Sequence, residues 1–183
     1  MSNWLQKAYS NLQDKVPGVR ESKDLQKELF DYYGDRLVEA EKMTGYNPYV
    51  ETPNRSYDDM GGRPAPLNPA QFPTLEELDA IRHYYGPQVV SEKIGGGVPG
   101  IATSLAVPAG HELEGFVTGD GWSQIWPDIK NNLVASYDEA TGKDKYPAGG
   151  LLGRLKKDMP PGEFEQFAKH ALSRTTIPPK YQE

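Results

Sequence analysis

The stretch Thr74-Leu75-Glu76-Glu77-Leu78-Asp79-Ala80-Ile81-Arg82-His83-Tyr84-Tyr85 decides the fold class. Its first four residues form a capping box, in which the Thr74 hydroxyl accepts from the Glu77 amide and the Glu77 side chain reaches back to the cap. The apolar residues after the box recur at helical spacing and are expected to face a core: Leu75, Leu78, Ile81 and Tyr85. The stretch therefore predicts an amphipathic helix. Beyond it, Gly86-Pro87 either kinks this helix or begins a new one with Pro87 at its first position.

The other side of the same helix carries polar side chains at contact spacing. Asp79, Arg82 and His83 stand at i, i+3 and i+4, so one carboxylate can touch both a guanidinium and an imidazole. Such a contact orients the histidine ring in advance. The spacing therefore predicts that Asp79 pairs with Arg82 or His83.

Further polar residues lie on the far side of an uncharged stretch, residues 94–110. Polar groups that are carried into helix packing must be paired, or each costs about 1–3 kcal/mol. We therefore expect His83 to lie near Asn131 or Asn132, with the His83 and His111 helices packed together. The complete candidate set for a site is Asp79, Arg82, His83, His111, Glu112, Asp128, Asn131 and Asn132.

The uncharged stretch itself has two interpretations. It contains two prolines and five glycines and is shorter than the ~20 apolar residues that span a bilayer. We expect a buried helix of small residues that lets neighbouring helices approach closely, and a membrane-active segment is the alternative.

The remaining chain is expected to alternate short helices with Pro/Gly-rich linkers, which makes the protein all-α: a small helical body with long extended arms. The expected helices are 2–15, 22–43 with Ser22 as N-cap, a basic helix 151–158, and two helices with an apolar face. One of these has a stripe of Trp122, Ile125, Trp126, Ile129, Leu133 and Val134, and the other, 161–173, has Phe164, Phe167, Ala168, Ala171 and Leu172 on one face. His170, in the last of these, lies among surface charges and is expected to be inert. The expected regions are N-terminal helices in 1–45, an extended arm in 46–73, a helical core in 74–142, and in 143–183 a linker, two helices and an extended tail.

The arm at 46–73 carries six prolines and little apolar periodicity. A structureless segment of this length is unusual inside a compact domain and is more often functional, disordered or laid over a partner. A mean hydropathy of −0.70 and a hydrophobic content of 37% are also low for a self-contained globule. Part of the chain is therefore expected to be ordered by its neighbours.

Composition and incomplete motifs exclude several classes. A net charge of −6 argues against direct nucleic-acid binding, and the absence of cysteine excludes disulfides, thiolate metal sites and a cysteine nucleophile. His111-Glu112-Leu113-Glu114-Gly115 has glycine where a zinc protease helix has its second histidine. Gly95–Gly100 lacks the Gly-Lys-Ser/Thr ending of a phosphate loop.

Two interpretations of the polar set stay open. His83 and His111 with Glu112 or Asp128 could hold a metal through two imidazoles and one carboxylate. The same groups could instead be hydrogen-bonded links between helices. No cofactor is expected, and the sequence leaves metal binding undecided.

The pattern Asp-x-x-Arg-His, then His-Glu, then Asp-x-x-Asn-Asn resembles a small, poorly characterised all-α family. Its members occur among tailed-bacteriophage virion and ejection-module proteins, and a related pattern occurs in toxin-like bacterial domains. The resemblance covers about 74–140, and the chain departs from it at Leu133-Val134-Ala135, where family members tend to have a glycine.

This resemblance implies a virion-associated protein, structural or ejected, that is made in the host cytoplasm. Its expected partners are other virion proteins or copies of itself, with membrane contact as a lesser alternative. The other hypothesis is a hydrolase of cell envelope or phospholipid, in which Asp79 orients His83 as general base. His111-Glu112 with Asn131-Asn132 would position water or stabilise an oxyanion. No Ser, Cys or Lys nucleophile stands beside the histidines, so water or a metal would be required.

Overall fold

The computed structural model describes residues 15–44, 73–106, 122–155 and 159–177, and most of these residues are helical with no strand among them. The helices are α2 (Val19–Thr44), α3 (Leu75–Ile94), α5 (Trp122–Thr141), the short 3-10 helix η2 (Ala148–Gly150) and α6 (Pro161–Arg174). Residues 97–106 are also helical. The predicted all-α class is confirmed.

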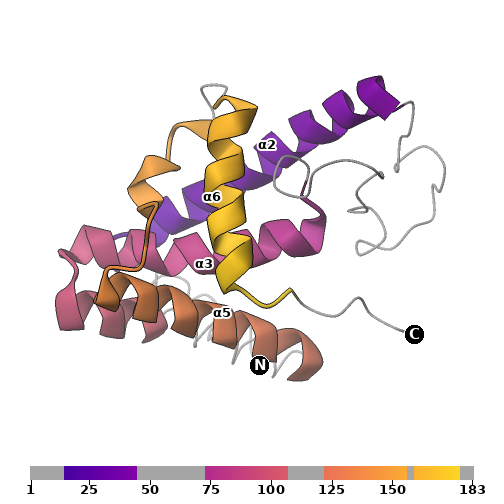
Figure 1. Ribbon diagram of the computed structural model, residues 1–183. Coiled ribbons are helices and arrows are strands. Elements are labelled where there is room, and N and C mark those ends of the chain that lie inside the picture. Colours follow the sequence, from indigo (N-terminus) through magenta and orange to yellow (C-terminus); the bar gives the residue numbers. More distant parts are fainter. Residues whose placement is uncertain (1–14, 45–72, 107–121, 156–158, 178–183) are drawn as a thin grey trace, which may run out of the picture.

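Helix α3 is the centre of the body. It contacts α2, α5, α6 and η2, and Figure 1 shows α5 running alongside it while α6 crosses it steeply. The capping box that begins α3 is present, with the Thr74 amide donating to Glu77 and the Glu77 amide donating to Thr74 at 2.8 Å and 3.2 Å. This local signal fixes where α3 starts and therefore which of its faces meets each neighbour.

One core joins α2, α3, α5 and α6 with the segment between α5 and α6. Tyr32 of α2 packs on Phe164 of α6 with ring centroids 4.5 Å apart, and the Tyr85 hydroxyl donates to the Phe167 carbonyl at 3.0 Å. The buried residues of this core are Leu25, Leu29, Tyr32, Tyr33, Leu78, Ile81, Tyr84, Tyr85, Val89, Ala135, Ala148, Leu151, Leu155, Met159, Phe164, Phe167, Ala168 and Ala171. The predicted apolar face of the last helix is confirmed.

The expected start of the second helix is wrong, and one of the two alternatives at Pro87 is excluded. Helix α2 begins at Val19, because Gly18 turns the chain with a φ of 85° and its carbonyl already accepts from the Ser22 amide at 2.8 Å. Ser22 therefore lies in the first turn and is not the N-cap. Pro87 does not begin a new helix, since α3 continues through it to Ile94.

The uncharged stretch is a helix over 97–106 but is only partly buried. Gly100 and Ser104 face the body, and a Cβ on Gly100 would lie 2.5 Å from the Ser91 hydroxyl, so the small residue does permit close approach. The opposite side is open, with Val98 81% exposed. The expected burial is therefore correct for one face only, and among the described residues no helix is long and apolar enough to cross a membrane.

The expected basic helix at 151–158 is also wrong where the structure describes it. Residues 151–154 form turns and Leu155 is 3-10, and they are held by the Glu28 carboxylate, which accepts from the Gly153 amide at 2.8 Å. Leu151 and Leu155 are buried beneath this turn. The expected helix 2–15, the arm and the C-terminal tail beyond Ile177 lie outside the described residues, apart from Lys15 and a buried Pro73.

Replacing either of two glycines by alanine should change the stability of the protein, but in opposite directions. A Cβ on Gly18 would lie 2.6 Å from the Val90 Cα, and its positive φ disfavours any side chain, so Gly18→Ala should reduce the free energy of unfolding by about 1–3 kcal/mol. Gly34 lies inside α2 with nothing within 4 Å of a Cβ, so Gly34→Ala should raise it by about 0.5–1 kcal/mol. Urea denaturation of both variants measures these changes. Equal effects of the two changes would contradict the packing of Gly18 against α3.

Candidate functional site

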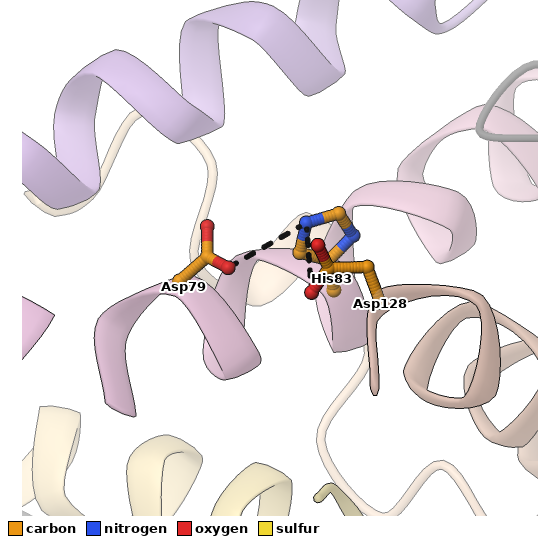
Figure 2. Close-up of side chains that lie close together, drawn as sticks. All are labelled: Asp79, His83 and Asp128. Carbon is orange, nitrogen blue, oxygen red and sulfur yellow. Dashed lines mark ion pairs between the residues drawn. The ribbon is translucent and has the colours of Figure 1, made fainter. Parts of the chain in front are cut away.

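A polar cluster lies between α3 and α5. Helix α3 supplies Asp79, Arg82 and His83, and the neighbouring turns of α5 supply Asp128 and Asn132. Figure 2 shows the Asp79 and Asp128 carboxylates both directed at the same nitrogen of the His83 ring. The two helices run side by side, so residues 49 positions apart meet, with His83 Nδ1 3.2 Å from Asn132 Oδ1.

The contacts within α3 follow the predicted spacing. Arg82 Nη2 lies 2.6 Å from Asp79 Oδ1 and 2.8 Å from His83 Nε2. The second oxygen of Asp79 is 3.7 Å from His83 Nε2, and Asp128 Oδ1 approaches the same nitrogen to 3.5 Å. The predicted pairing of Asp79 with Arg82 and the predicted approach of His83 to Asn132 are confirmed.

The hydrogen bonds define one tautomer of His83. Asn132 Oδ1 can only accept, so Nδ1 carries the proton, and Arg82 can only donate, so Nε2 presents its lone pair. The ring is therefore neutral in this arrangement. Its basic nitrogen points at the two carboxylates and the guanidinium, which is the orientation needed in a general base or a metal ligand.

Burial differs across the cluster. The His83 side chain is 8% exposed, whereas those of Asp79 and Arg82 are 28% and 23% exposed. The imidazole is thus held in packing, and solvent reaches the cluster from the side of these two residues. This arrangement can bind a cation or orient a water molecule at the edge of the helix pair.

The other residues of the candidate set lie elsewhere. The Asn131 amide donates to the Thr176 carbonyl at 2.9 Å and accepts from the Thr176 amide at 2.7 Å, so it fastens the chain after α6 to α5. Asn131 therefore holds backbone and does not touch His83 through any of these bonds. His111 and Glu112 lie outside the described residues.

A second buried network joins α3, α5 and α6, and the sequence analysis did not identify it. The Tyr84 hydroxyl donates to Asp138 Oδ2 at 3.0 Å and lies 3.0 Å from His170 Nε2. Arg174 donates two hydrogen bonds to the Asp138 carboxylate, which is fully buried. His170 is thus part of the packing, and the expectation that it is inert among surface charges is wrong.

Burial and hydrogen bonding set the protonation of this network. Burial opposes ionisation of Asp138, but hydrogen bonds from Arg174 and Tyr84 outweigh it and lower the pKa of the carboxyl below its usual value. Burial also lowers the pKa of His170, an effect that the nearby Asp138 charge only partly offsets. The folded protein therefore favours a neutral His170 beside an ionised Asp138.

Helix α5 packs with its polar side inward. Asn131, Asn132, Ser136 and Asp138 are buried, together with Ile125 and Ala135. Three large residues of α5 are exposed instead: Trp126 at 57%, Leu133 at 48% and Tyr137 at 54%. The prediction that Trp126 and Leu133 face the core is wrong, because the polar side chains of α3 require partners that only the other side of α5 provides.

Comparison of the chain with family models, with curated proteins and with solved structures finds no match. The chemistry of the cluster is therefore inferred from its geometry.

The depressed pKa of His170 makes stability depend on pH. Because the unfolded chain takes up a proton near the ordinary histidine pKa of 6.5 and the folded chain resists it, stability should fall as pH drops through this value. In His170→Gln this part of the pH dependence of stability should disappear. Urea denaturation between pH 8 and pH 5 measures it as the difference between wild type and variant, which cancels other titrating groups. Parallel curves for the two proteins would contradict the burial of neutral His170.

Proposed function

We propose that the chain is a virion-associated protein of a tailed bacteriophage, structural or ejected, that is ordered by its assembly neighbours. The observation that supports this most directly is a row of three large, exposed side chains on α5. Leu133 and Tyr137 follow Trp126 by seven and eleven positions, which places the three side chains on one side of the helix. Exposed aromatic and aliphatic side chains gathered in this way are typical of protein interfaces.

The composition and the motif pattern support the same role. The chain is polar for its length, so part of it gains little from burying itself alone. The pattern from Asp79 to Asn132 resembles the one found in virion and ejection-module proteins. The partner that we propose for the row is an apolar surface of another virion protein or of a second copy of this chain.

Incorporation into particles tests this role. Purified particles of the phage that encodes the chain should contain it, as measured by quantitative mass spectrometry. The double change Trp126→Ser with Leu133→Ser should reduce its copy number at least about tenfold, because apolar anchors dominate interface energies. Both side chains are half exposed, so the fold should survive, as circular dichroism can verify.

Val98→Ser is the matched control, since Val98 is 81% exposed on the helix 97–106 and lies outside the row. Its incorporation should equal that of wild type. Absence of the wild-type chain from purified particles would refute the proposed role.

A hydrolase of cell envelope or phospholipid is the second candidate, and the His83 cluster is the observation that favours it. The lone pair of His83 Nε2 faces Asp79 and Asp128, while Asn132 holds the other ring nitrogen. Once the partly exposed Arg82 side chain turns away from Nε2, His83 can take a proton from water at the edge of the cluster. The nearby amides and Arg82 could stabilise the charge that develops on the substrate.

Turnover tests this second candidate. Wild type should release product from phospholipid vesicles or from peptidoglycan, and His83→Gln should reduce the rate at least about 100-fold, as expected on loss of a general base. Glu21→Gln, at a partly exposed position of α2 that pairs with Lys93, should retain the wild-type rate. If wild type releases no product from either substrate, the hydrolase candidate is wrong.

A further inference from the structure

Three metal-ligating side chains converge between α3 and α5. One ligand atom each from Asp79, His83 and Asp128 lies within 4.8 Å of the other two (Figure 2). We propose that these residues bind a divalent transition-metal ion such as Mn²⁺ or Zn²⁺, and that Arg82 competes with the ion for the same position. An ion on His83 Nε2 would occupy the lone pair that the general base of the hydrolase candidate needs, so this site is independent of that activity and of assembly into a virion.

The spacing of the ligand atoms fits such an ion. Ions of this class lie about 2.0–2.2 Å from imidazole nitrogen and carboxylate oxygen, so two ligands at a near-tetrahedral angle are about 3.3–3.6 Å apart. His83 Nε2 lies 3.5 Å from Asp128 Oδ1 and 3.7 Å from Asp79 Oδ2. Both distances are close to that range, and the third pair of ligand atoms, from Asp79 and Asp128, lies within 4.8 Å, so rotation of these two side chains can close the set around an ion.

The ligand types select the class of ion. One imidazole nitrogen with two carboxylates suits Mn²⁺, Zn²⁺ and related ions, whereas Ca²⁺ and Mg²⁺ prefer oxygen ligands alone. Two ionised carboxylates balance the charge of a divalent ion. Three protein ligands also leave coordination positions for water on the side where the Asp79 side chain is 28% exposed.

Asn132 supports the imidazole from behind. Histidines that bind metals commonly donate their second N–H to an oxygen, which fixes the tautomer and the ring orientation. Asn132 Oδ1 lies 3.2 Å from His83 Nδ1, and the Asn132 residue is only 3% exposed. The ring is therefore held with Nε2 toward the carboxylates before any ion arrives, which is a feature separate from the grouping of the three ligands.

Arg82 holds the position that the ion would take. Its Nη2 donates to the same His83 lone pair at 2.8 Å and to Asp79 at 2.6 Å. One lone pair cannot serve both, so the guanidinium must leave when the ion binds. The Arg82 side chain is 23% exposed and can swing toward solvent. Removing the guanidinium should therefore strengthen ion binding.

Isothermal titration of the full, untagged chain with ZnCl₂ tests the site, and electron paramagnetic resonance with MnCl₂ provides a second measurement. Wild type should bind one ion at this site. Asp128→Asn and Asn132→Ala should each weaken binding about 10–100-fold, the effect of disturbing a metal ligand or its support. Arg82→Ala should strengthen it about two- to fivefold, which corresponds to loss of a partly exposed ion pair. Glu21→Gln removes a carboxylate outside the cluster and should change nothing.

Either of two results would overturn the site: no saturable binding by wild type and by Arg82→Ala, or unchanged binding by Asp128→Asn. Circular dichroism verifies the fold of each variant, and Asp79→Asn replaces Asp128→Asn in the decision if the latter fails to fold. These measurements record neither particle incorporation nor turnover. A failure of the metal site is therefore distinguishable from a failure of the proposed function.

Discussion

The structure depends on pairing the polar side chains of α3 as that helix enters the core. His83 and Tyr84 lie on buried positions of α3, and a buried polar group without a partner costs about 1–3 kcal/mol. Helix α5 supplies Asn132 to His83 and Asp138 to Tyr84. Because these partners lie on one side of α5, they fix its rotation about its own axis, and apolar contacts such as those of Ile125 and Ala135 fill the space between them.

This rotation explains why α5 exposes its largest apolar residues. A helix cannot turn both its Asn132–Asp138 side and its Trp126–Leu133 side toward the same neighbour. Loss of burial for one large apolar side chain costs about 1.5–3 kcal/mol, whereas an ionised carboxylate such as Asp138 without partners would cost more. The polar pairing therefore prevails, and the protein retains an apolar row that only another surface can cover. The His83 cluster and the exposed apolar row therefore lie on opposite sides of α5, and the rotation of this helix about its axis determines both.

The sequence predicts the features that depend on local spacing. The capping box at Thr74, the Asp79–Arg82 pair and the apolar face of α6 involve residues at most four positions apart or a single helical period, and all are present. The orientation of α5 depends on α3, which begins 47 positions earlier in the chain. The apolar residues within α5, taken alone, therefore predict that the wrong side of this helix is buried. The same limit applies to His170, which meets Tyr84 across 86 positions. A polar period that runs through Asp128, Asn131, Asn132 and Asp138 was the one available signal for the buried side.

Because of Arg82, the His83 cluster can form as the chain folds without a bound metal ion. Two carboxylates close together would repel each other, and many metal sites therefore fold only with their ion. Here the guanidinium supplies a positive charge at Asp79 and donates to the lone pair of His83, so these two groups have a partner without an ion. Because that charge comes from a partly exposed side chain, it can be withdrawn without disturbing the buried Asn132 contact. The body can thus be complete before the cluster receives a cation, and a partner that draws Arg82 away would favour ion binding through that residue alone.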